Sequence, residues 1–255
     1  MRQNILKVQV LQRAIDILEI IGADSGPVSL KRITEQVGLP KSTVYRLLTN
    51  LEARGLVSCG ADGGYRLGLN LLLLGQRAEK GFEIKRLSRP YIVKLNEFTA
   101  ESVHLGVLQK NRVLYVDSID SPHAIRLVAQ IGGTNAVHCT SLGKALLLRH
   151  SDAEISQILA EESLEPRTPY TILSPEAYLR EMEEVRRQGY AIDDRESGED
   201  CFCVGAPVYG RFGQVVAAIS VSGPTSRISR PLAQTRIVPW LLEATKLLSK
   251  SLGGL

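Results

Sequence analysis

The residues best suited to hold a small molecule lie on two predicted strands near the end of the chain. Residues 201–209 and 214–222 alternate with a period of two, and the loop 210–213 between them predicts an antiparallel hairpin. One face of this hairpin is uniformly apolar and is expected to pack into the core. It consists of Phe202, Val204, Ala206, Val208, Val215, Ala217, Ile219 and Val221.

The opposite face of the hairpin carries small and polar side chains. It consists of Cys201, Cys203, Gly205, Ala218, Ser220 and Ser222. With a four-residue loop, Cys203 would lie opposite Ser220, and Cys201 opposite Ser222. Small side chains leave space, and thiols and hydroxyls offer hydrogen bonds, so this face predicts a ligand pocket. A helix packed tightly on the small residues is the alternative interpretation.

Other arrangements that could do chemistry fit their motifs poorly. The tripeptide Gly143-Lys144-Ala145 lacks the spacing and the hydroxyl residue of a phosphate-binding loop. The two hairpin cysteines, taken together with His138 and Cys139, lack the CxxC spacing that is usual in zinc sites. We therefore expect neither a nucleotide loop nor a metal centre.

One pair of residues could belong to a hydrolytic site. His104 and Asp117 would face each other across a hairpin if the turn at residues 109–112 has four residues. No GxSxG nucleophile motif accompanies them, so an ordinary cross-strand pair is the preferred interpretation. The sequence predicts no catalytic residues, no cofactor and no metal.

A second polar set lies near the N-terminus and suits DNA. A helix predicted from Pro40 to about Arg54 points Val44, Leu47, Leu48 and Leu51 inward. It leaves outside the residues Lys41, Ser42, Thr43, Tyr45, Arg46 and Asn50. Hydrogen-bond donors at a helix N-terminus are what a recognition helix presents to base edges and phosphates in the major groove.

The elements before this helix predict a helix-turn-helix. Apolar residues spaced by three and four between Val8 and Ile21 predict a first helix. Ser29 is a suitable N-cap for a short second helix, and Gly38-Leu39 predicts the tight turn that leads into the recognition helix.

The segment after the recognition helix predicts a wing. Strands at residues 56–58 and 65–67 flank the glycine-rich segment 59–64. Arg66 is placed there for a minor-groove or phosphate contact, and Ser29 and Arg66 complete the predicted DNA-binding set. The alternative is a helical hairpin with a merely solvated polar face.

Charge and composition agree with a DNA-binding protein. The 255 residues are 44% hydrophobic and 23% charged, which is ordinary for a globular protein. The net charge of +4 falls within residues 1–85, with 12 Lys and Arg against 8 Asp and Glu, while the rest of the chain is balanced. No apolar run could span a membrane, and we find no signal peptide, so a cytoplasmic protein with reduced cysteines is expected.

Longer segments resemble the IclR family of transcriptional regulators. The resemblance rests on LQRAIDILEIIG, VSLKRITEQVGLPKSTVYRLLTNLEARGLV, GGYRLGLNLLLLG, CTSLGKALLL, RRQGYAIDDRESGEDCFCVGAPVYG and GQVVAAISVSGPTSRIS, in the order of the family and over nearly the whole chain. It implies a DNA-binding regulator with an effector pocket for a small organic molecule, often a carboxylate-bearing catabolite. The residues that it implies for this pocket are Asn135, Ser141, Leu142, Asp193, Cys203, Ser220 and Ser222. Positions 135, 141 and 142 vary within the family, so the resemblance does not identify the ligand. Asp193 could equally be a surface carboxylate, as Asp194 and Glu196 are expected to be.

The expected organisation is a mixed α/β chain of two domains. Residues 1–75 form a mostly α winged helix-turn-helix, 76–85 a linker helix, and 86–255 an α+β effector domain; the leucine-rich stretch from Leu69 to about Gly81 predicts the helix that joins the two domains. In the effector domain an antiparallel sheet is flanked by helices. Its expected elements are strands at 102–108, 113–119 and 125–129 besides the hairpin, and helices at 83–99, 141–150, 152–161, 175–188 and 231–249.

The sequence thus predicts a ligand-responsive repressor of a catabolic operon. Its partners would be double-stranded operator DNA and a small organic effector, and it would act as a homodimer or homotetramer, since one winged helix reads few base pairs. Two alternatives stay open at this point. One is an enzyme that uses residues 86–255 on a small metabolite, and the other is an architectural DNA-binding protein without a ligand.

Overall fold

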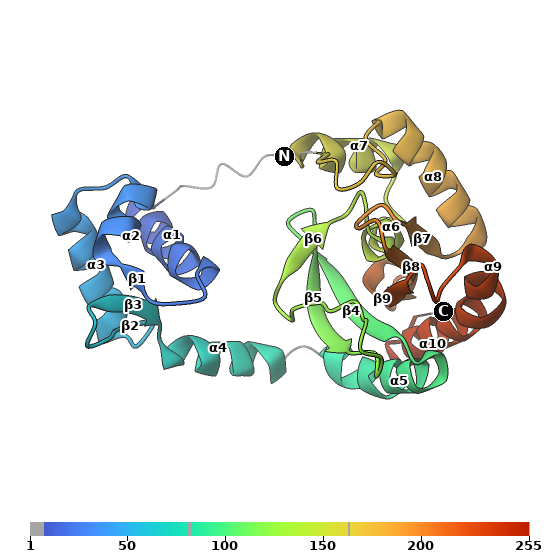
Figure 1. Cartoon of the computed structure of the whole chain (residues 1–255), viewed down its shortest axis with the longest axis horizontal. Coiled ribbons are helices and arrows are strands. Elements are labelled where there is room, and N and C mark those ends of the chain that lie inside the picture. Colours follow the sequence, from blue (N-terminus) through green and yellow to red (C-terminus); the bar gives the residue numbers. More distant parts are fainter. Residues whose placement is uncertain (1–7, 81–82, 163, 255) are drawn as a thin grey trace. The chain divides into compact units, whose positions relative to one another are not determined.

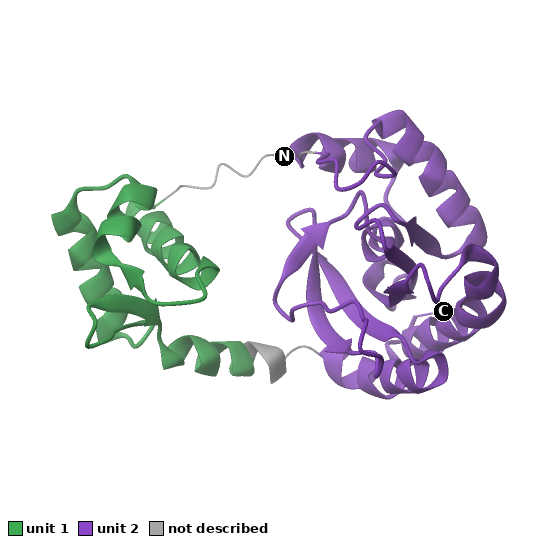
Figure 2. Ribbon diagram, viewed as in Figure 1, with its two compact units in different colours: residues 1–82 green, residues 83–255 purple. Residues whose placement is uncertain are grey.

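The structure of the protein is a computed structural model that describes residues 8–80, 83–162 and 164–254. The chain divides into two compact units, residues 1–82 and 83–255, which are described separately (Figure 2). The predicted end of the linker helix at Gly81 lies outside the described residues. No helix in the described part of the chain is both long enough and apolar enough to cross a membrane.

Unit 1 contains three helices packed on a small sheet, followed by a fourth helix (Figure 1). The elements are α1 (Gln9–Ala23), β1 (Val28–Ser29), α2 (Leu30–Val37), α3 (Lys41–Ala53), β2 (Val57–Cys59), β3 (Gly64–Leu67) and α4 (Leu69–Lys80). The antiparallel sheet has the order β1-β3-β2. This is the predicted helix-turn-helix with its wing.

Local sequence signals set the boundaries of α2 and α3. The Ser29 hydroxyl caps α2 by accepting a hydrogen bond from the Arg32 N–H at 3.3 Å. Gly38 ends α2 with φ of +66°, a left-handed conformation that favours glycine. Pro40 precedes the first residue of α3, and Val44 and Leu48 bury fully in the core of the unit.

Unit 2 is built on one six-stranded antiparallel sheet (Figure 1). Its strands are β4 (Ser102–Gln109), β5 (Arg112–Ile119), β6 (Thr134–Ala136), β7 (Ala191–Asp194), β8 (Cys201–Tyr209) and β9 (Val215–Pro224), in the order β6-β5-β4-β9-β8-β7. Its helices are α5 (Glu83–Thr99), α6 (Ser141–Leu146), α7 (Asp152–Glu161), α8 (Pro175–Gln188), α9 (Arg230–Leu232) and α10 (Val238–Ser251). A short π-helical turn, Ala233–Ile237, joins the last two.

Two apolar clusters lie on opposite faces of this sheet. One joins α5 and α10 to the sheet through side chains such as Ile92, Val204, Ile219 and Leu241. The other joins α6, α7 and α8 to the opposite face, through Leu146, among others. The predicted α+β domain, an antiparallel sheet flanked by helices, is confirmed.

The register of the β8–β9 hairpin differs from the prediction by two residues. Cys203 lies opposite Ser222, not Ser220, and Cys201 lies opposite Pro224. The connecting loop has five residues instead of four, and a bulge between Val208 and Tyr209 adds one more. Because two shifts of one residue restore the side-chain period, the polar set still shares one face of the sheet.

The predicted pairing of His104 with Asp117 is wrong. A bulge between Leu105 and Gly106 shifts the register, so that His104 lies opposite Ser118 and Asp117 opposite Leu105. Asp117 therefore points to the other side of the sheet, where it accepts a hydrogen bond from Arg89 at 3.0 Å.

Three other element predictions need correction. Residues 125–129 are not a strand, because β6 occupies the sheet edge beside β5 instead. The helix expected at 141–150 ends at Leu146. The last helix is divided, since the π-helical turn separates α9 from α10.

Candidate functional site

The outer face of α3 presents a continuous set of exposed polar side chains. Lys41, Ser42 and Thr43 form its first turn, and Tyr45 and Arg46 follow on the same surface; all are exposed. No hydrogen bond or ion pair engages the side chains of Lys41 or Arg46 within the part of the chain that the structure describes. These donors are therefore free to bind phosphates and base edges.

Three other predicted DNA-binding residues have partners inside the unit. Asn50 donates to the carbonyl of Arg46 at 2.8 Å. Ser29 is exposed, but its hydroxyl caps α2. In the wing, Arg66 donates to Asp62 at 3.2 Å, and the hydrogen bond from the Gly64 N–H lowers the pKa of the Asp62 carboxyl. Asp62 thus holds the half-exposed Arg66 side chain against the tip of the wing.

The polar face of the sheet in unit 2 opens into a cavity of about 210 Å³. Seven lining residues are those that the sequence analysis gave for the effector pocket: Asn135, Ser141, Leu142, Asp193, Cys203, Ser220 and Ser222. They come from five elements, β6, α6, β7, β8 and β9, that the sheet and its helix bring together. The volume is below the range of roughly 300–1,000 Å³ for drug-sized ligands and suits a small metabolite.

Cys201, which the sequence analysis placed on the small polar face, also lines the cavity. Seven further lining residues were not predicted: His104, Tyr115, Leu127, Val128, Ala129, Thr140 and Ser197. Alternation could have placed His104 on the face opposite Val103 and Leu105, but its position across from Ser220 depends on the pairing of β4 with β9, which the sequence does not reveal. Residues 127–129 could not be predicted, since they reach the cavity as irregular backbone, which leaves no periodic signal in the sequence.

Asp193 is not the surface carboxylate that was considered as an alternative. It is 1% exposed and binds its own turn, accepting hydrogen bonds from the N–H of Glu196 at 2.8 Å, the N–H of Ser197 at 3.2 Å and the hydroxyl of Ser197 at 2.5 Å. Burial raises the pKa of this carboxyl, while these hydrogen bonds oppose the shift. Glu196, also expected at the surface, is buried as well.

Among the described lining residues, Asp193 is the one acidic side chain, and none is a lysine or an arginine. The imidazole of His104 packs edge-on against Tyr115, with the ring centroids 5.8 Å apart. Burial lowers the pKa of His104 to about 4, so this side chain is neutral at neutral pH. The lining offers mainly hydroxyl, thiol and amide groups.

The small residues of β8 also seat a helix, as in the alternative interpretation. A Cβ atom added to Gly205 would lie 2.5 Å from the carbonyl oxygen of Ser141, which begins α6. The missing side chain therefore lets α6 approach the sheet, and this approach brings Ser141 and Leu142 to the cavity. The helix seat and the cavity are adjacent parts of one face.

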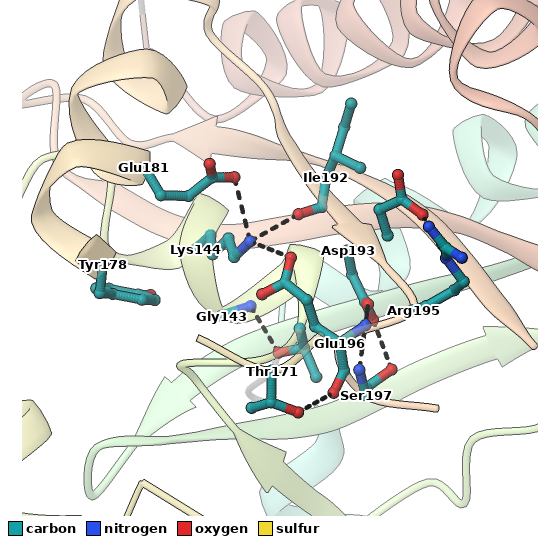
Figure 3. Close-up of polar contacts among 12 residues, drawn as sticks. Gly143, Lys144, Thr171, Tyr178, Glu181, Ile192, Asp193, Arg195, Glu196 and Ser197 are labelled. Carbon is teal, nitrogen blue, oxygen red and sulfur yellow. Dashed lines mark hydrogen bonds and ion pairs between the residues drawn. The ribbon is translucent and has the colours of Figure 1, made fainter. Parts of the chain in front are cut away.

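A buried ion pair lies behind this wall (Figure 3). Lys144 of α6 is fully buried, and its ammonium group donates to Glu196 at 2.6 Å, to the carbonyl of Ile192 at 2.9 Å and to Glu181 at 3.2 Å. These contacts give Lys144 a structural role, in agreement with the rejection of a phosphate-binding loop at residues 143–145.

Two family models match the chain. The IclR helix-turn-helix domain matches residues 10–58, and the bacterial transcriptional regulator IclR C-terminal domain matches residues 76–250, more than half of the chain. The chain belongs to the IclR family. The predicted family is thus confirmed, and its members are transcriptional regulators rather than enzymes.

Full-length IclR relatives align over almost the whole chain. The HTH-type transcriptional regulator KdgR of Escherichia coli K12 is 34% identical over 247 residues, which covers 96% of this chain and 93% of KdgR. The transcriptional repressor IclR of the same organism is 30% identical over 252 residues, covering 98% and 92%. A crystal structure of an IclR homologue from Microbacterium hydrocarbonoxydans, complexed with 4-hydroxybenzoate, superposes with a TM-score of 0.83 at 26% identity and covers 95% of this chain and 98% of that one.

Proposed function

We propose that this IclR-family regulator is a repressor of a catabolic operon, that it reads its operator through α3 and the wing, and that a small organic effector binds in the cavity of unit 2. The observation that carries the proposal is the convergence of seven side chains, six of them small or polar, from five elements on one cavity. The repressor assignment is supported by the name of a relative that is 30% identical. Such a protein acts where the DNA is, in the cytoplasm.

The effector that fits this cavity best is small and rich in hydrogen-bonding groups. The homologue from Microbacterium hydrocarbonoxydans binds 4-hydroxybenzoate, which carries a carboxylate and a hydroxyl. A carboxylate-bearing effector in this chain would be bound by hydroxyl and amide groups, such as those of Ser220, Ser222 and Asn135, because the described lining has no lysine or arginine. Close to Asp193, the effector would place a hydroxyl rather than its carboxylate.

Effector binding is proposed to change the affinity for the operator. This is allostery in the strict sense, with two separate sites and two arrangements of the protein that the ligand favours unequally. An architectural DNA-binding protein would have no use for a polar cavity of this kind. An enzyme would need a nucleophile and a base in contact, and the imidazole of His104 has no such partner among the described residues.

The DNA-reading half of the proposal is tested by removing the exposed donors of α3. The operator is first obtained by selecting bound fragments from genomic DNA with the purified full-length protein. The triple variant Ser42→Ala, Thr43→Ala, Arg46→Ala should then lose specific binding in fluorescence anisotropy while retaining its unfolding temperature, because all three side chains are exposed. Equal operator affinity of the triple variant and the wild type would rule out α3 as the reader.

The ligand half is tested by a thermal-shift screen of organic acids, sugar acids and aromatic acids, with 4-hydroxybenzoate included. A ligand present at 100 times its Kd stabilises the native state by about 2.7 kcal/mol, which raises the unfolding temperature measurably. We expect at least one compound to raise this temperature and to alter operator binding. A compound that is instead converted to product would favour the enzyme.

A further inference from the structure

The two halves of one cavity wall are joined by side chains that do not line the cavity themselves. Ser141 and Leu142, at the start of α6, form one part of the wall, and Asp193 and Ser197 form the other. Between these parts, the Lys144 ammonium of α6 lies 2.6 Å from the Glu196 carboxylate (Figure 3). This ion pair connects the helix to the turn.

The turn at residues 194–200 is anchored to the sheet by Asp193 of β7, which accepts hydrogen bonds from Glu196 and Ser197, and by the N–H of Arg195, which donates to the carbonyl of Cys201 in β8 at 2.9 Å. It follows β7, an edge strand of four residues that pairs with β8 on one side. Its backbone is held by Thr171, whose hydroxyl donates to the Glu196 carbonyl at 2.7 Å, and by Thr168, which donates to the Arg195 carbonyl at 2.6 Å. Both threonines belong to an irregular segment, so neither joins the turn to α6. Lys144 of α6 makes that connection through its hydrogen bond to Glu196.

We infer that Lys144 and Glu196 are positioning residues of the effector cavity: their buried ion pair holds the turn at residues 194–200 against α6 and so keeps this wall closed. The inference rests on the proposed function for its biological meaning, since it concerns the cavity proposed for the effector. A lysine that is fully buried and makes three polar contacts has one fixed position, which suits such a role.

The strength of this ion pair depends on pH. Burial raises the pKa of Glu196 to about 7, and the Lys144 ammonium opposes that shift without cancelling it. One oxygen, Oε2, is buried without a hydrogen-bond partner among the described residues, which adds to the cost of ionisation. The titratable and charged groups that interact with this carboxyl from the surrounding elements are Lys144, Glu181, Tyr178, Cys139 and Asp193. As the pH falls through about 7, Glu196 gains a proton, the pair loses its charge attraction, and the tie between the turn and α6 weakens.

The test measures access to Cys203, which lies in the cavity and pairs with Asp193 in the β7–β8 ladder. Cys203 is 7% exposed and lines the cavity, so its rate of alkylation by iodoacetamide reports how far the wall formed by the turn opens. Rates are followed for each cysteine by peptide mass spectrometry, with the exposed Cys59 of unit 1 as the internal reference. The assay contains neither effector nor DNA, so failure of the proposed function would not change its result.

The variant Glu196→Gln removes the charge and keeps the size of the side chain. Loss of a charge-assisted hydrogen bond should accelerate alkylation of Cys203 at pH 8 by roughly tenfold to a hundredfold relative to the wild type. The ratio of the two rates should fall toward one as the pH drops below about 7, where the wild-type carboxyl is itself protonated. Glu196→Asp, which keeps the charge, should restore part of the protection.

The matched control is Glu181→Gln. Glu181 binds the same ammonium group at 3.2 Å, but it extends from α8, which contributes no residue to the described lining. This variant should leave the Cys203 rate within about twofold of the wild type. Equal rates for Glu196→Gln and wild type at pH 8, an equal rise in Glu181→Gln, or a rate ratio that does not depend on pH would overturn the inference.

Should Glu196→Gln fail to fold, the pH series on wild type and Glu196→Asp decides in its place. Loss of Cys203 protection relative to Cys59 below pH 7 supports the inference, and constant protection contradicts it.

Discussion

Arg46 and Lys41 should make different contributions to DNA binding, although both are exposed cations on α3. An arginine that reads a guanine through two hydrogen bonds discriminates between bases, so Arg46→Ala should weaken operator binding by about 1–3 kcal/mol and relax specificity. Lys41→Ala should weaken binding to all sequences alike and reduce the slope of log K against log salt by about one. Salt titrations on operator and on unrelated DNA measure both effects. An identical loss on both DNAs for Arg46→Ala would contradict its role as a base reader.

His104 should make the protein less stable in acid. Burial lowers its pKa to about 4 in the folded chain, against about 6.5 in the unfolded chain, so the folded state binds fewer protons between these values. Its contribution to stability is therefore complete above pH 6.5 and is lost as the pH falls to 4. His104→Gln should flatten this decline by an amount on the order of 3 kcal/mol, measured as the pH dependence of urea unfolding. The same substitution at the exposed His123 should leave the decline unchanged, and an equal effect at both positions would contradict this assignment.

Individual residues could be predicted from the sequence where a local period reveals them. The outer face of α3 follows from helical spacing, and Cys203, Ser220 and Ser222 follow from strand alternation. Lys144 and Glu196 could not be found in this way, because their pairing joins a helix to a turn about 50 residues later and each looks like an ordinary surface charge. Asn135, Ser141, Leu142 and Asp193 came from the family resemblance, and their role as effector contacts remains a prediction.

At the scale of elements, the position of α6 depends on a glycine in β8. Gly205→Ala would place a methyl group against the backbone of Ser141 and push α6 away from the sheet. Overpacking of this kind costs about 1–3 kcal/mol, which chemical denaturation measures. Gly198→Ala is the control, because its added Cβ would make an ordinary contact at 3.5 Å with Cys201. It should change stability by no more than about 0.5 kcal/mol, and equal costs at both positions would mean that α6 is not seated on Gly205.

The elements themselves were predictable to different degrees. The bounds of α5, α7 and α8 match the predicted ranges, because caps such as Ser151 and Ser174 and clear helical periods mark them. The strand registers were not predictable, since each bulge moves the pairing by one residue without changing the alternation that the sequence displays. The apolar residues between 125 and 129 predict a strand, but the segment is irregular: Leu127 and Val128 line the cavity, and Ile125 is exposed.

At the scale of the whole molecule, the protein should be at least a dimer. Exposed apolar side chains occur on α1, where Val10 is 67% exposed, and on α4, where Leu69 is 80% exposed. Exposed apolar side chains of this kind mark surfaces that become buried when two copies associate. In addition, two operator half-sites one helical turn apart require two copies of α3. Light scattering at micromolar concentration should give at least twice the 28.0 kDa of one chain. Leu72→Asp on α4 should lower the measured mass, and a monomeric wild type with and without DNA would refute the prediction.

The central claim is that the cavity of unit 2 senses a ligand whose binding is felt by a separate DNA reader. It is tested most directly by measuring operator affinity, with and without a compound from the thermal-shift screen, for wild type and Ser222→Leu. The leucine fills the cavity from a position whose side chain lies away from the Val221 core, so folding should change by no more than about 1–3 kcal/mol. Ser222→Leu should bind the operator as the wild type does and should no longer respond to the compound. A Ser222→Leu protein that still binds the compound and responds normally would contradict it.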